Sequence, residues 1–167
     1  ADESVVTVFD PSLGFTTGGG WFYWPGTASG SYPGDRTNFG YTMKYNKKLT
    51  NVKGSLLFIR RTEDDQKYRI KSNAIGGLAL GEDANVPLGW ASFSGKNTYI
   101  EPGWEEAEGN HGFTAYVEDR DDPGDGIDRI WIETRNKQGE TLPQNSMPEP
   151  AVDNAVEIQG GNIVAPH

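Results

Sequence analysis

Phe39-Gly40-Tyr41-Thr42-Met43-Lys44-Tyr45 alternates large apolar side chains with small or polar ones. Successive side chains of a β-strand point to opposite faces, whereas an amphipathic helix repeats its apolar residues every three or four positions. The stretch therefore predicts a half-buried strand, in which Phe39, Tyr41, Met43 and Tyr45 share one face.

The same alternation recurs along the chain. It is clear at residues 5–9, 67–71, 113–117 and 129–133. Further apolar segments predict strands at 16–24, 52–60, 88–94, 99–100 and 155–164, and Gly- and Pro-containing turns separate several of them. The sequence thus predicts nine or ten strands.

No window of 11 residues has helical periodicity, and the chain carries 22 Gly and 10 Pro. We therefore predict an all-β fold in one domain, residues 1–167, built as a two-sheet antiparallel β-sandwich of the jelly-roll or Ig-like kind. Residues 138–153, with three prolines, lack any periodicity. They are expected to form a long irregular connection that delivers the last strand.

Composition restricts the classes of partner and the location that can be expected. A net charge of −9 argues against nucleic acid as a partner, because phosphate binding rests on clustered Lys and Arg. No apolar run is long enough to span a bilayer, and there is no cysteine. Ala1-Asp2-Glu3 would suit the terminus left by signal-peptide cleavage, and an engineered terminus would explain it equally well. A secreted, extracellular protein is expected. Catalytic motifs are absent from the sequence, and we predict that the protein is not an enzyme.

The segment from Glu118 to Asp128, EDRDDPGDGID, places six carboxylates within eleven residues. Such crowded negative charges suit a hard cation such as Ca²⁺, which takes six to eight oxygen ligands. The predicted ligands are Glu118, Asp119, Asp121, Asp125 and Asp128. Neutralising Asp125 and Asp128 is then expected to lower the melting temperature only when calcium is present. The alternative is a solvated turn whose charge is partly neutralised by Arg120 and Arg129.

Gly18-Gly19-Gly20 is followed by four aromatics, Trp21-Phe22-Tyr23-Trp24. In a strand these must alternate, so about two of them face outward. Outward aromatics stack on sugar rings or are covered by a neighbouring subunit. The predicted ligand-binding residues are Trp21, Tyr23, Trp24 and Trp104. The alternative is a central strand that is buried on both faces.

Several segments, in the same order along nearly the whole chain, carry a resemblance. These are residues 10–21 (DPSLGFTTGGGW), 38–41 (NFGY), 126–132 (GIDRIWI) and 160–164 (GGNIV). The chain resembles a β-sandwich module that closes large bacterial cell-surface proteins after Ig-like repeats of the polycystic-kidney-disease or hyalin type. The resemblance implies an extracellular, non-catalytic accessory or structural domain.

These observations predict a secreted, calcium-binding structural or adhesive building block of an extracellular surface or filament. Its partners would be further copies of itself or an extracellular polysaccharide. Strand exchange through the β-branched segment at residues 4–9 would join the copies. The alternative is a carbohydrate-binding module that uses exposed aromatics.

Overall fold

The computed structural model describes residues 14–25, 34–45, 51–83, 86–120 and 127–165. Within these ranges nine strands form one antiparallel sheet in the order β8-β7-β6-β5-β4-β3-β2-β1-β9. The strands are β1 (Phe15–Tyr23), β2 (Arg36–Tyr45), β3 (Val52–Arg61), β4 (Lys67–Asp83), β5 (Val86–Ile100), β6 (Glu108–Glu118), β7 (Arg129–Arg135), β8 (Val156–Glu157) and β9 (Gly160–Val164).

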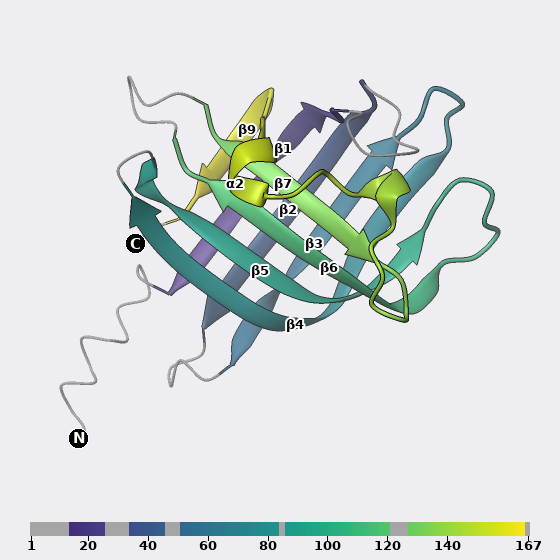
Figure 1. The fold of residues 1–167 in the computed structure, drawn as a ribbon, viewed down its shortest axis with the longest axis horizontal. Coiled ribbons are helices and arrows are strands. Elements are labelled where there is room, and N and C mark those ends of the chain that lie inside the picture. Colours follow the sequence, from purple (N-terminus) through teal and green to yellow (C-terminus); the bar gives the residue numbers. More distant parts are fainter. Residues whose placement is uncertain (1–13, 26–33, 46–50, 84–85, 121–126, 166–167) are drawn as a thin grey trace.

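The sheet curls on itself, so that β5–β7 cross in front of β1–β3 in Figure 1. The long strands β4 and β5 carry the bend, and their pairing shifts register after Ser72, Ile75 and Gly81. Such bulges bend and twist strands. The all-β prediction is confirmed. The two-sheet sandwich is not, because a single curled sheet already buries its own concave face.

The concave face holds the core. On β2 the alternation is as predicted, with Phe39, Tyr41 and Met43 buried and Tyr45 partly buried against the core. Other fully or nearly buried side chains come from β1, β3–β7 and β9: Phe22, Phe58, Ile70, Phe93, Phe113, Ile132 and Ile163. Every strand except β8 thus contributes at least one buried side chain to the interior.

Two consecutive residues, Ile158 and Gln159, form hydrogen bonds near opposite ends of the sheet. The amide of Ile158 donates to the carbonyl of Asp128 beside β7, at 3.0 Å. The next amide, of Gln159, donates to the carbonyl of Trp21 on β1, at 2.8 Å. The chain therefore passes from one end of the sheet to the other between β8 and β9.

Several predicted boundaries need correction. The segments 88–94 and 99–100 belong to one strand, β5, and 155–164 is split into β8 and β9. Residues 138–153 are irregular apart from a 3-10 turn, η2 (Pro143–Asn145), and the first residues of one helical turn, α2 (Ala151–Asn154). The strand predicted at 5–9 lies outside the described residues. No helix in the described ranges is long and apolar enough to cross a membrane.

Two buried tyrosines are expected to make the folded state less stable at alkaline pH. Burial, as the largest cause, raises the pKa of Tyr41 and of Tyr99 well above the usual 10.0. Above about pH 10 the unfolded chain loses these protons while the folded chain keeps them, so the free energy of unfolding falls by up to ~1.4 kcal/mol per pH unit for each tyrosine.

Between pH 9 and 11 we expect the free energy of unfolding to fall by ~1 kcal/mol less in Tyr41→Phe than in wild type. Urea denaturation at each pH measures it. Tyr23→Phe is the control, because Tyr23 is 51% exposed. Equal pH slopes for wild type and Tyr41→Phe would contradict the assignment.

Candidate functional site

The predicted acidic turn, residues 118–128, is attached to the C-terminal strand through two carboxylates near its ends, those of Asp119 and Asp128. Asp128 accepts hydrogen bonds from the amides of Arg120 at 2.6 Å and Ile163 at 2.7 Å. Asp119 accepts from the amide of Ala165 at 3.2 Å. Both carboxylates are buried, and their charges contribute to the raised pKa of Tyr41 after burial itself. These two residues therefore fix the C-terminal strand against the end of β6 and the start of β7.

A hydroxyl holds the same strand from its other side. Thr16 donates to the carbonyl of Val164 at 2.8 Å and lies 3.0 Å from the Tyr41 hydroxyl. Residues 163–165, at the end of β9 and directly after it, are thus bonded by Thr16, Asp119 and Asp128, which come from three separate segments. The position of β9 depends directly on the two ends of the acidic turn.

The Glu118 carboxylate lies on the opposite face of the chain from that of Asp119 and has different partners. It follows Tyr116 on the same face of β6, and its two oxygens accept from the Tyr116 hydroxyl and from Nε of Arg120, both at 2.6 Å. Because successive strand residues point to opposite faces, Glu118 and Asp119 are directed apart. Glu118 is fully buried, and its charge is balanced by Arg120.

The predicted calcium site is consequently placed only in part. Asp121 and Asp125 lie outside the described residues. Among the residues that are described, no three His, Cys, Asp or Glu side chains form a group that could hold a metal ion. The structure brings Asp119 and Asp128 to the base of the turn, and calcium binding stays a prediction.

The four predicted ligand-binding aromatics do not form one platform. Trp24 is 1% exposed and packs in the core, so its assignment to a binding surface is wrong. Trp104 packs edge-on against Tyr99 and His111, with ring centroids 5.5 and 5.9 Å away. Of the four, only Tyr23 is an exposed side chain.

Trp21 is largely covered on the outer face of β1. The guanidinium of Arg36 lies 4.0 Å from the centroid of its ring, and Tyr23 packs edge-on against it at 5.3 Å. Its indole also contacts the backbone of Gly160, where a Cβ would come within 2.5 Å of Nε1. The indole serves to join β1, β2 and β9, and it offers little ring surface to a sugar.

A buried polar cluster fills one end of the curl. Arg60 is fully buried; its Nε donates to Asp35 at 2.8 Å and its Nη1 to Asn145 Oδ1 at 3.1 Å. The guanidinium lies between the rings of Trp24 and Tyr68, 4.3 and 4.2 Å from their centroids. This side chain therefore ties β3 to β1, β4 and η2. A sequence signal exists, because Arg60 is in phase with the buried Leu56 and Phe58.

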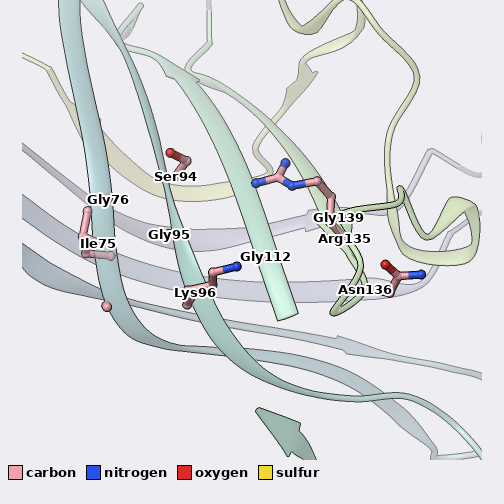
Figure 2. A pocket seen from close by; sticks show the side chains of 10 residues that line it. Ile75, Gly76, Ser94, Gly95, Lys96, Gly112, Arg135, Asn136 and Gly139 are labelled. Atoms are coloured by element: carbon pink, nitrogen blue, oxygen red, sulfur yellow. The ribbon is translucent and has the colours of Figure 1, made fainter. Parts of the chain in front are cut away.

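A recessed pocket lies on the outer side of the sheet, where β4 bulges away from β5 (Figure 2). Its volume is about 240 Å³. The charged side chains that line it are Lys96 of β5 and Arg135 of β7, and Gly112 of β6 lies between them. The sequence carries no local signal of this pocket, because its residues come mainly from four different strands.

Comparisons with known proteins give no relative from which a role could be transferred. The sequence matches no model of a protein family. No curated protein is significantly similar to it, and no solved structure matches its fold. The resemblance to the cell-surface module therefore remains an expectation from the sequence.

Proposed function

We propose that this domain is a secreted, non-catalytic building block of an extracellular surface or filament. In this proposal calcium bound at the acidic turn stabilises the C-terminal strand, and exchange of that strand between copies joins neighbouring domains. The observation that supports it is the attachment of β9 to Asp119 and Asp128, the residues at the two ends of the turn.

The attachment links ion binding to strand release. Releasing β9 breaks the hydrogen bonds that Asp119 and Asp128 accept from its backbone. A cation that binds only when the ends of the turn are in place favours the attached state, because a ligand shifts an equilibrium toward the state it binds better. Calcium would therefore control how readily β9 detaches.

The geometry of β9 suits exchange between copies. It is the last strand of the sheet order, it pairs with β1 over five register positions, and two residues connect it to β8. A second copy could supply an identical strand with identical contacts, which is how domain swapping forms assemblies at low cost. A displaced β9 would leave the edge of β1 open to that strand.

The calcium prediction can be tested with Asp125→Asn. Calcium at about 100 times its Kd contributes ~2.7 kcal/mol, which corresponds to a rise of roughly 5–10 °C in the melting temperature of a chain this long. We expect this rise in wild type and in the control Asp64→Asn, which alters an exposed residue of the β3–β4 turn, and not in Asp125→Asn. The measurement is thermal unfolding in calcium and in chelator.

Asp128→Asn should behave differently from the expectation drawn from the sequence. Its carboxylate accepts two backbone hydrogen bonds, so the variant loses stability in chelator as well as in calcium. Assembly is followed in the same samples by size exclusion and negative-stain imaging. Monomers at every calcium concentration, or an unchanged calcium response in Asp125→Asn, would refute the proposal.

A further inference from the structure

Two cationic side chains converge on a gap in the outer face of the sheet. Lys96, Gly112 and Arg135 are register partners across β5, β6 and β7. Two strand spacings separate the outer pair, or roughly 10 Å between their Cα atoms. Figure 2 shows both side chains reaching toward β6 from either side of it, with the Lys96 amine ending beside Gly112.

Arg135 is held in place over the glycine. Its Nη1 donates to Thr114 Oγ1 at 2.8 Å and to Glu133 Oε1 at 2.6 Å, and its Nη2 donates to the carbonyl of Phe113 at 3.2 Å. A Cβ on Gly112 would come within 3.2 Å of Arg135 Nε. The glycine therefore leaves room for the guanidinium, which is fixed before any ligand arrives.

Lys96 supplies the charge that is not balanced. It is exposed, and within the described ranges no carboxylate forms an ion pair with it, whereas Arg135 is paired with Glu133. Two cations directed at one gap repel each other, and an anion between them relieves that repulsion. Because Glu133 already offsets Arg135, the excess is about one positive charge. That balance favours a singly charged carboxylate over a doubly charged phosphate.

The rest of the pocket offers neutral hydrogen-bonding groups. The register of β4 slips twice between Ser72 and Gly77, and a bulged strand leaves backbone groups outside the ladder. The Ser94 hydroxyl and the Asn136 side chain also border the pocket. The pocket measures about 240 Å³. Pockets for drug-sized ligands span about 300–1,000 Å³, so this one matches a single small polar unit.

We propose that this pocket binds one uronate residue of an acidic polysaccharide. The carboxylate lies between Lys96 and Arg135, and the sugar hydroxyls bond to Ser94 and the bulged backbone of β4. Asn136 borders the site with its side chain already hydrogen-bonded to Glu140 and to the amide of Gln138. A uronate carries a carboxylate and several hydroxyls on one sugar ring. It therefore matches both the cationic part of the pocket and its neutral hydrogen-bonding part. The site does not depend on calcium or on strand exchange.

The experiment is a titration of the ¹⁵N-labelled protein with galacturonate, followed at the amides of Lys96, Gly112 and Arg135. Galactose and acetate are titrated in parallel, because each carries one half of the recognised chemistry. We expect saturable shifts at these amides with galacturonate. Galactose loses the charge-assisted hydrogen bonds of the carboxylate, and acetate loses the hydrogen bonds of the sugar hydroxyls, so either control should bind at least ~tenfold more weakly.

Variants separate the site from general charge effects. Lys96→Ala should weaken galacturonate binding at least ~tenfold, and Lys96→Arg should retain most of it. Lys53→Ala is the matched control, since Lys53 is an exposed strand lysine that does not line the pocket. Thermal unfolding verifies that each variant is folded.

Three outcomes would overturn the proposal. Absence of shifts with galacturonate rules out the site. Equal binding of acetate shows an anion site without sugar recognition. Equal loss in Lys96→Ala and Lys53→Ala shows that net charge, and not the pocket, is responsible. Failure of calcium-dependent assembly leaves these outcomes unaffected, so the two proposals are judged separately.

Discussion

Replacing Arg60 with methionine is expected to lower the free energy of unfolding by about 3–5 kcal/mol, the usual cost of removing one partner of a buried ion pair. Arg60 and Asp35 have side chains that are 0% and 2% exposed, so the remaining carboxylate has no access to water. The variant also loses the bonds to Gln144 and Asn145 that hold η2. Urea denaturation of the purified domain measures the change.

Arg61→Met is the matched control for this prediction. Arg61 is the next residue of β3 and is exposed, so its loss should change stability by no more than ~0.5 kcal/mol. The double variant Arg60→Met, Asp35→Leu should recover part of the loss, because it removes the unpaired carboxylate. Similar stabilities for Arg60→Met and Arg61→Met would show that the buried pair does not stabilise the fold.

Gly161→Ala is expected to destabilise the protein by roughly 3–5 kcal/mol, through backbone strain and a steric clash together. Gly161 has a φ of 99°, a conformation that L side chains rarely adopt. A Cβ there would lie 2.0 Å from the carbonyl oxygen of Gly19 on β1, so the two strands could not keep their spacing. Denaturation should show the loss, and limited proteolysis should show release of β9.

Gly40→Ala tests whether any glycine of this sheet is equally sensitive. Gly40 lies on β2, and a Cβ there would have no atom within 4 Å. A change of no more than ~0.5 kcal/mol is expected. If both alanine variants unfold alike, the close approach of β1 and β9 is not the cause.

Local patterning predicted the strands whose two faces differ. On β2, Phe39, Tyr41 and Met43 are buried as their spacing predicts, and Asn38, Thr42 and Lys44 on the other face are exposed. On β7 the prediction is incomplete, because Trp131 is buried on the other face, where its Nε1 donates to the carbonyl of Pro148. A distant segment covers that face, and alternation within one strand cannot report it.

The candidate sites depended on contacts that have no local signal. Asp119 and Asp128 stood out as acidic residues, but their bonds to β9 join segments about 35–46 residues apart. The split of 155–164 into two strands follows from the curl of the sheet, which brings β1 next to the end of the chain. The Lys96 pocket likewise exists only because Gly112 and Arg135 pair in that register.

The pairing of β1 with β9 sets the order of events during synthesis. Thr17 and Val164 are register partners, so β1 pairs with a strand that is synthesised after all the other described strands. β1 leaves the ribosome long before its neighbour β9, and among the described strands only β9 pairs with that edge of β1. An unpaired edge is a template for aggregation, so this edge of β1 is open to pairing with other chains until β9 has emerged.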